Sequence, residues 1–166
     1  MRIAVYAGSF DPVTRGHLSV MERAARTFDL LFVVVADNPA KRSLLTAGER
    51  VSLLHECSCQ LENVEVAQTD GLVVELARQV NARFLVRGVR GVTDIEAEIS
   101  LANVNHQLAP EITTFFVPAD PALSEVSSSR LKQLAEAGAD LSELCTPNVA
   151  RALSAKLARR GSLGAL

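Results

Sequence analysis

The residues of this chain best suited to chemistry lie at positions 8–17, which read Gly-Ser-Phe-Asp-Pro-Val-Thr-Arg-Gly-His. An apolar run at Ile3–Ala7 precedes them and predicts a buried strand, and apolar residues at helical spacing follow them. The stretch is therefore predicted to be a loop between a strand and a helix, with His17 in the first helical turn. Because a helix start offers unpaired N–H groups and a positive dipole end to an anion, we expect His17 to bind a phosphoryl oxygen.

Three later stretches carry further groups that bind anions. Lys41 follows the second strand-like run, Arg87 and Arg90 follow the fourth, and three serines at 127–129 follow the fifth after a Pro-rich loop. Each stretch alone is readily explained as solvated surface or as a helix cap. If all these loops lie at one edge of a parallel sheet, however, their side chains converge with His17 on one cleft. Such a cleft suits two phosphorylated substrates.

The elements that must position these residues alternate between strand and helix patterns. Strands are predicted at Ile3–Ala7, Leu31–Ala36, Val64–Ala67, Phe84–Val86 and Thr114–Val117. Helices are predicted after residue 17, from a capping box at Thr46 to about Leu61, and at Leu72–Val80, Asp94–Leu108, Ser128–Ala137 and Pro147–Leu157. The strand-like runs lack polar alternation, which indicates helices on both faces of the sheet. The predicted fold class is α/β: a Rossmann-like, doubly wound parallel sheet of five strands in a single domain.

The length and the composition of the chain limit the classes of function that it can have. The chain has 166 residues, 48% of them hydrophobic, which predicts one domain at 1–158 and a flexible C-terminal tail at 159–166. Its formal net charge of −2 gives no general affinity for nucleic acid. Cys57, Cys59 and Cys145 are wrongly spaced for a zinc site or a disulfide framework and fit a reducing compartment.

Sequence signals that are absent from the chain argue against further classes of protein. We find neither an apolar run long enough to span a membrane nor a basic, apolar leader, so we expect a cytoplasmic protein without a membrane partner. The Gly-x-Gly-x-x-Gly fingerprint and the Gly-Lys-Ser/Thr phosphate loop are absent after the first strand. This argues against a dehydrogenase and a P-loop ATPase.

The ten-residue stretch resembles the signature of the nucleotidyltransferase superfamily, a Gly-Ser/Thr-Phe-Asp-Pro turn followed by Thr/His-x-Gly-His. Within that superfamily the chain is similar to the bacterial phosphopantetheine adenylyltransferase family, from the first strand to about Leu157. The similarity rests further on Asn38–Lys41, Gly71–Val74, Val86–Arg90, Asp94–Glu98, Leu101–Asn105 and Val126–Ser129.

The resemblance implies roles for individual residues. The implied catalytic residues are His17, which would stabilise the transition state, and Ser9, Lys41 and Arg90. Phosphopantetheine would contact Ser9, Lys41, Leu72, Val73, Arg87, Leu101 and Asn105, although core packing explains Leu101 equally well. ATP would contact Ser9, Phe10, His17, Gly88, Val89, Arg90, Glu98, Leu123, Ser124, Glu125, Val126, Ser127, Ser128 and Ser129.

Two positions depart from the common family pattern. Ala97 stands where an aromatic residue is frequent, and Leu123-Ser124-Glu125 replaces a segment that often reads aromatic-Ser-Phe. We expect these changes to affect packing around the adenine and leave the residues at the reacting phosphates unchanged.

The activity implied by the resemblance is transfer of AMP from ATP to 4′-phosphopantetheine, giving dephospho-coenzyme A and pyrophosphate. A phosphate monoester is a competent nucleophile near neutral pH, so direct attack needs no covalent enzyme intermediate. Mg²⁺ is the expected cofactor, held by ATP phosphates and water without a protein ligand cage. The family also implies a homohexamer and feedback binding of coenzyme A.

Two alternatives remain open at this stage. A related nucleotidyltransferase acting on nicotinamide mononucleotide, or using CTP with a phospho-alcohol, would share the first motif. A non-catalytic ATP-binding module would hold nucleotide without turnover, although it would not need the acceptor-side charge of Lys41. The shortness of the chain, without an evident tRNA-binding extension or basic surface, argues against a class I aminoacyl-tRNA synthetase.

Overall fold

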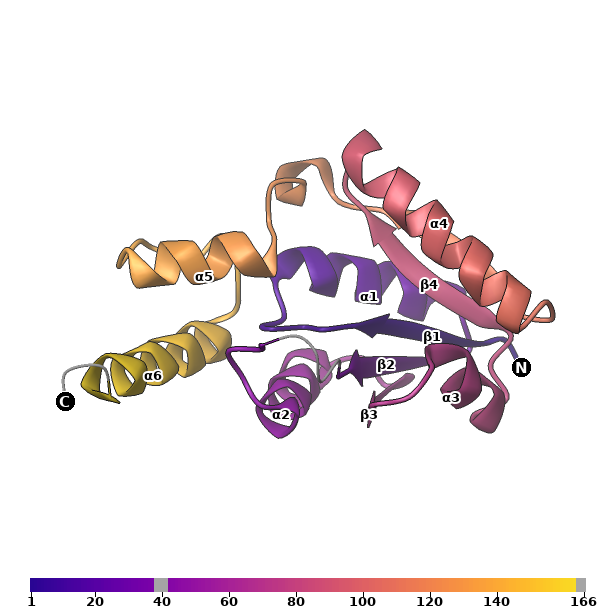
Figure 1. The fold of residues 1–166 in the computed structure, drawn as a ribbon, viewed down its shortest axis with the longest axis horizontal. Coiled ribbons are helices and arrows are strands. Elements are labelled where there is room, and N and C mark those ends of the chain that lie inside the picture. Colours follow the sequence, from indigo (N-terminus) through magenta and orange to yellow (C-terminus); the bar gives the residue numbers. More distant parts are fainter. Residues whose placement is uncertain (38–41, 164–166) are drawn as a thin grey trace.

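Apolar segments form the strands of one parallel sheet in the computed structural model, which describes residues 1–37 and 42–163 (Figure 1). The strands are β1 (Ile3–Gly8), β2 (Leu30–Ala36), β3 (Val64–Thr69), β4 (Phe84–Val89) and β5 (Thr113–Pro118). Their order in the sheet is β3-β2-β1-β4-β5, with every neighbouring pair parallel. This order confirms the predicted doubly wound α/β fold and places its switch point between β1 and β4.

Helices connect successive strands, and further helices follow the last strand. They are α1 (Arg15–Thr27), α2 (Ala47–Ser58), α3 (Val73–Gln79), α4 (Val92–Leu108), α5 (Ser128–Glu136) and α6 (Pro147–Leu163), with a short 3₁₀ turn η1 (Pro121–Leu123) before α5. The predicted capping box of α2 is confirmed: Thr46 Oγ1 accepts from Glu49 N, and Glu49 Oε2 accepts from Thr46 N. Within the described residues, no helix combines the length and the apolar character needed to cross a membrane.

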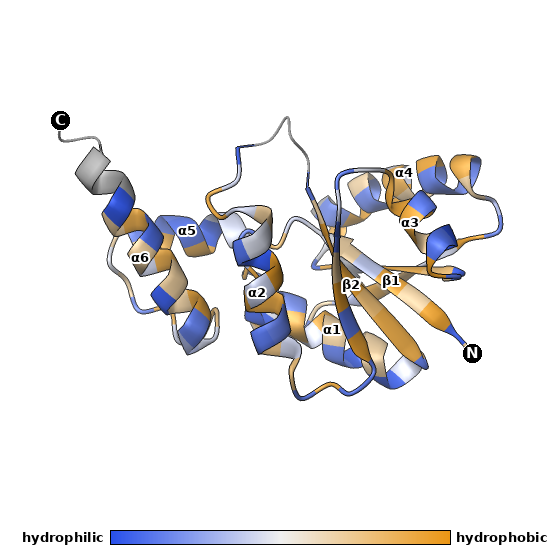
Figure 2. Cartoon of the chain, turned by 90° about the horizontal axis from the view of Figure 1, so that it is seen from below, coloured by the Kyte–Doolittle hydropathy of each residue, from blue (hydrophilic) through white to orange (hydrophobic). Residues whose placement is uncertain are grey.

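The sheet is covered on both faces, as the apolar strands predict. On one face, side chains of α1, α2, α5 and α6 pack against alternate residues of β1 and β2, with Met21, Leu54 and Leu131 fully buried. On the other face, α3 and residues just after α4, Ala109 and Ile112, cover the intervening residues, among them Val5 and Val34. Figure 2 shows β1 and β2 mostly in the hydrophobic colour and the helices striped with both colours. The buried core therefore fixes the positions of the strands. The loops at the carboxyl ends of the strands lie outside this core and can form a binding site.

The sheet opens at the switch point. Pairing of β1 with β4 ends at Tyr6 and Val86, whereas β4 continues alongside β5 as far as Val89. Beyond the last β1–β4 pair, Arg87 Nη1 donates a hydrogen bond of 2.7 Å to Ala7 O, which β4 no longer reaches. A side chain thus takes the place of a strand contact where the two strands separate.

Several predicted boundaries were wrong. β4 runs three residues past Val86, so Arg87 and Gly88 belong to the strand and not to the loop after it, because pairing with β5 sustains the strand. The helix α6 continues six residues past the predicted end at Leu157. The flexibility expected at 159–166 and the domain boundary at 158 remain predictions.

Candidate functional site

A cleft of about 540 Å³ lies at the carboxyl ends of β1 and β4. It brings together predicted site residues from separate stretches of the sequence: Ser9, Phe10, His17, Arg87, Gly88, Arg90, Glu98, Val126, Ser127, Ser128 and Ser129. They come from the loop after β1 and the start of α1, from β4, α4 and the turn between them, and from the segment that begins α5. The convergence expected from the parallel sheet is therefore observed for these residues.

Other candidates lie elsewhere. Leu72, Val73, Val89, Leu101, Asn105, Leu123, Ser124 and Glu125 are not part of the lining of this cleft. The side chains of Leu72 and Leu101 are exposed, whereas Val73 packs partly against the core. Lys41, with Asn38 to Ala40, lies outside the described residues, although the adjoining Arg42 and Ser43 line the cleft. The roles assigned to all these residues remain predictions.

His17 is held by the cap of its own helix. Thr14 is the N-cap of α1, its backbone N–H donates to His17 Nδ1 at 3.0 Å, and its hydroxyl accepts from His17 N at 3.3 Å. This is a capping box in which imidazole takes the place usually held by Glu or Gln. Because Nδ1 accepts a hydrogen bond, the proton of the neutral ring is assigned to Nε2.

The surroundings of His17 keep the ring neutral. Burial lowers the pKa of His17 to about 4, with the positive charges of Arg90 and Arg87 acting in the same direction. A neutral imidazole with Nε2–H is a hydrogen-bond donor that does not depend on protonation near neutral pH. It can stabilise charge developing on a phosphoryl oxygen.

Phe10 shapes the loop beside His17. Its backbone φ of 46° lies in the left-handed region, which is costly for a residue other than glycine. Its buried ring meets the rings of Tyr6 and His17 edge to face, with centroids 5.4 Å and 5.1 Å away. Packing thus fixes a strained turn at the floor of the cleft.

The guanidinium of Arg87 forms an ion pair with a carboxylate. Its Nε and Nη2 donate to the two carboxylate oxygens of Glu98 at 2.5 Å and 2.7 Å, in addition to the bond to Ala7 O. Both side chains of this ion pair are mostly buried. Glu98, expected to contact ATP, therefore also orients the guanidinium expected to contact phosphopantetheine.

Arg90 is arranged in the same way. Its Nε and Nη2 donate to Asp94 at 2.7 Å and 3.1 Å, and the hydrogen bonds from Arg90 lower the pKa of Asp94. Asp94 and Glu98 lie one turn apart on α4, so one helix presents a carboxylate to each arginine. The cleft thus carries less net positive charge than the sequence suggested.

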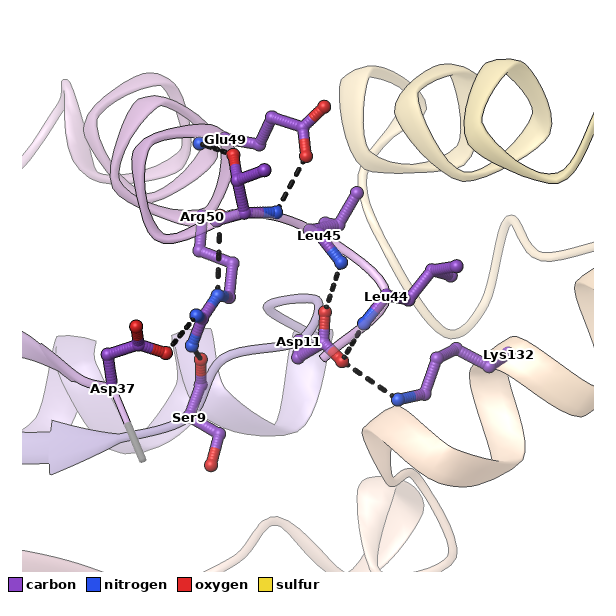
Figure 3. Close-up of polar contacts among 9 residues, drawn as sticks. Ser9, Asp11, Asp37, Leu44, Leu45, Glu49, Arg50 and Lys132 are labelled. Carbon is purple, nitrogen blue, oxygen red and sulfur yellow. Dashed lines mark hydrogen bonds and ion pairs between the residues drawn. The ribbon is translucent and has the colours of Figure 1, made fainter. Parts of the chain in front are cut away.

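A polar cluster supports the loop at residues 9–14 between β1 and α1, here called the motif loop (Figure 3). Asp11 accepts hydrogen bonds from Leu44 N, Leu45 N and Lys132 Nζ at 2.9, 2.8 and 2.9 Å. Burial opposes ionisation of this carboxyl, but these three donors outweigh it and hold its pKa below the ordinary value. Asp11 therefore joins the motif loop to the segment before α2 and to α5.

Arg50 completes this cluster from α2. Its side chain is 2% exposed and donates to Ser9 O at 3.0 Å, to Asp37 Oδ1 at 2.5 Å and to Thr46 O at 3.3 Å. Figure 3 shows the guanidinium between the carbonyl of Ser9 and the carboxylate of Asp37. No role was expected for Arg50 or Lys132, because the spacing of apolar residues contains no signal for their contacts with the motif loop.

The start of α5 closes the cleft. Ser127 is the N-cap of α5, its hydroxyl accepting from Arg130 N at 3.2 Å, so the predicted helix start is confirmed. Ser128 Oγ donates to Pro12 O at 2.8 Å, which ties this start to the motif loop. The first amides of α5 line the same cleft as His17 and can bind a phosphate group.

In the described part of the chain, no three His, Cys, Asp or Glu side chains gather as metal ligands. The donors around the cleft are N–H groups, hydroxyls and guanidinium groups, which bind phosphate rather than a metal. This donor set is compatible with a magnesium ion carried by the phosphates of a nucleotide.

Sequence comparisons agree on one family. The family described as Cytidylyltransferase-like matches residues 5–134. A protein from Caldanaerobacter subterraneus subsp. tengcongensis named phosphopantetheine adenylyltransferase is 46% identical over 156 residues, which cover 94% of this chain and 98% of that protein. Proteins of the same name from Levilactobacillus brevis and Gloeobacter violaceus are each 45% identical, over 95% and 94% of this chain and 98% and 97% of their own lengths.

Comparison with solved structures supports the fold. A putative nicotinate-nucleotide adenylyltransferase from Vibrio parahaemolyticus superposes with a TM-score of 0.66 at 20% identity, covering 92% of this chain and 99% of the other. The Plasmodium falciparum nicotinic acid mononucleotide adenylyltransferase complexed with NaAD gives a TM-score of 0.66 at 15% identity, covering 94% and 95%. These likenesses show a shared Rossmann-like architecture.

Proposed function

The chain belongs to the cytidylyltransferase-like family and, within it, to the phosphopantetheine adenylyltransferases, and from this membership we propose that it transfers the adenylyl group of ATP to 4′-phosphopantetheine. The observation that carries the proposal is the convergence of His17, Arg87, Arg90 and the start of α5 on one cleft. Such a set of donors suits two phosphate-bearing substrates held side by side.

In the proposed reaction, an oxygen of the phosphopantetheine phosphate attacks the α-phosphorus of ATP. A new P–O bond forms as the bond from the α-phosphorus to the β-phosphate oxygen breaks, and pyrophosphate leaves with that electron pair. The products are dephospho-coenzyme A and pyrophosphate. No covalent enzyme intermediate is needed, because the incoming phosphate is itself the nucleophile.

The cleft residues would act by position and charge. Ser9, Lys41 and Arg87 would fix the attacking phosphate, while His17 Nε2–H would stabilise charge on the transferring phosphoryl group. Arg90 and the first amides of α5 would bind the leaving pyrophosphate. We propose that Mg²⁺ accompanies ATP, held by phosphate oxygens and water, and supplies positive charge to the phosphates.

Three further properties are proposed from the family resemblance: assembly as a homohexamer, feedback binding of coenzyme A, and a cytoplasmic location. Exposed apolar side chains on α4, including Ile99, Val104 and Leu108, support self-association, since a patch of this kind commonly marks an interface. Light scattering after size-exclusion chromatography measures the assembly, and titration with coenzyme A measures the feedback site.

Incubation of the purified protein with ATP, Mg²⁺ and 4′-phosphopantetheine tests the reaction. We expect mass spectrometry to detect dephospho-coenzyme A and a coupled assay to detect pyrophosphate in equal amount. Parallel incubations with nicotinamide mononucleotide, or with CTP and a phospho-alcohol, test the related acceptors. Turnover with one of those acceptors in place of phosphopantetheine would overturn the proposal, as would ATP binding without pyrophosphate release.

A further inference from the structure

The loop that carries Ser9 needs support from outside its own segment. It follows the end of β1 at Gly8, so Ser9 O lies beyond the last pair of residues that β1 forms with β2. The next residue, Phe10, has a φ of 46°. A conformation of this kind persists only where the surroundings impose it.

Arg50 supplies that support at Ser9. A nearly fully buried guanidinium is costly unless its N–H groups are paired. Here they are paired with three segments at once, because Arg50 donates to Ser9 O after β1, to Asp37 just after β2, and to Thr46 O at the start of its own helix. Only the planar guanidinium fork can serve acceptors in different directions from one rigid position.

Ser9 and Arg50 both belong to the lining of the cleft. Figure 3 shows the Ser9 hydroxyl directed away from the guanidinium that holds its carbonyl. The backbone of Ser9 is thus held by Arg50 while its side chain stays available to a ligand. A shift of this loop by a fraction of an ångström would move a group that the proposed reaction uses.

We propose that Arg50 is a positioning residue for adenylyl transfer, which acts by holding the carbonyl of Ser9 and, through it, the strained turn at Phe10. This inference rests on the proposed function and adds a residue to it. Asp37 provides the matched comparison, because it is the ion-pair partner of Arg50 but does not contact Ser9 O. Its side chain is 40% exposed, and the Asn that replaces it keeps an oxygen that can accept the hydrogen bond from Arg50 Nη2.

The experiment compares the turnover of wild-type protein, Arg50→Lys and Asp37→Asn, each checked by thermal unfolding. In Arg50→Lys we expect kcat to fall by about tenfold to a hundredfold, with the KM of each substrate changed by less than about threefold. In Asp37→Asn kcat should stay within about threefold of wild type, because the bond to Ser9 O remains. Equal losses in both variants, or a wild-type kcat in Arg50→Lys, would overturn the proposal.

Chemical rescue separates positioning from simple stability. We expect millimolar ethylguanidine to restore part of the turnover of Arg50→Ala and to leave Asp37→Asn unchanged. Guanidinium compounds weaken folding, so they cannot rescue a variant that is merely unstable. If Arg50→Ala does not fold, the kinetics of Arg50→Lys decide the question.

A readout without turnover keeps this inference separate from the proposed function. In protein without ligand, the backbone amide resonances of Phe10 and Asp11 should move in Arg50→Lys and stay near their wild-type positions in Asp37→Asn. Unmoved resonances in Arg50→Lys would refute the positioning role whatever the acceptor is. Absence of dephospho-coenzyme A formation by the wild-type protein would instead refute the proposed function.

Discussion

Replacing His17 with Gln tests whether the imidazole in the cleft is neutral. Gln is a favoured residue at the third position of a helix, where its side-chain oxygen can accept from Thr14 N as His17 Nδ1 does. The variant therefore keeps the cap of α1 and removes only the titratable ring. We expect it to fold.

The expected loss in the free energy of unfolding follows from the difference between the pKa of this histidine in the unfolded protein and in the folded protein. An unfolded histidine titrates near 6.5, and His17 in the folded protein titrates at about 4. Because the folded pKa is depressed, the neutral ring contributes its full stability above about pH 6.5 and loses it as the pH falls toward about 4. Between pH 7 and pH 5 this linkage removes about 2 kcal/mol from the free energy of unfolding.

The assay is urea unfolding of both proteins at pH 7 and at pH 5. Other groups titrate over this range in both proteins, so the informative quantity is the change in wild type minus the change in His17→Gln. We expect wild type to lose about 2 kcal/mol more than the variant. An equal loss in both proteins would show that His17 titrates normally, and the neutral-donor role would then fail.

Turnover of the same variant tests the chemistry. Loss of one donor to a developing charge costs on the order of a hundredfold to a thousandfold in kcat. We expect this loss for His17→Gln with little change in ATP affinity. Turnover near that of wild type would remove His17 from the mechanism.

Three other substitutions test neighbouring features. In Gly88→Ala the new Cβ would lie 2.9 Å from Val20 Cγ2. We therefore expect chemical denaturation to show a loss of about 1–3 kcal/mol in the free energy of unfolding. An unchanged denaturation midpoint would mean that α1 can shift freely. In Asp94→Asn the charge of Arg90 loses its carboxylate, so the KM for ATP should fall by about threefold in initial-rate kinetics; a rise would mean that Asp94 chiefly orients Arg90. In Lys41→Ala, a prediction from the sequence alone, the KM for phosphopantetheine should rise more than that for ATP, and equal effects would contradict the assignment.

The order of elements was predictable because its causes are local. Buried parallel strands must be apolar on both faces, and runs such as Leu31–Ala36 show this directly in the sequence. The extent of β4 was not predictable, because Arg87 and Gly88 resemble a loop when read alone. Arg87 remains in the strand because it pairs with Phe116 of β5, which is distant in sequence.

The site was predictable only in part for the same reason. The motif at 8–17 identified His17, and its helix start fixed where that ring would lie. The support around the motif depends on pairs such as Asp11 with Lys132, 121 positions apart, which no spacing rule indicates. The pairing of Arg90 with Asp94 had a usable signal, since opposite charges four residues apart on a helix commonly meet.

The separation of β1 from β4 limits how this protein can be made more robust. A substitution that lengthened the contact between these strands would add main-chain bonds and raise resistance to heat, yet it would compete with Arg87 for the carbonyl of Ala7. Engineering for durability should therefore leave this seam alone and work on surfaces far from it. The separation of β1 from β4 lowers the stability of the sheet, and it leaves room for the cleft at the carboxyl ends of these strands.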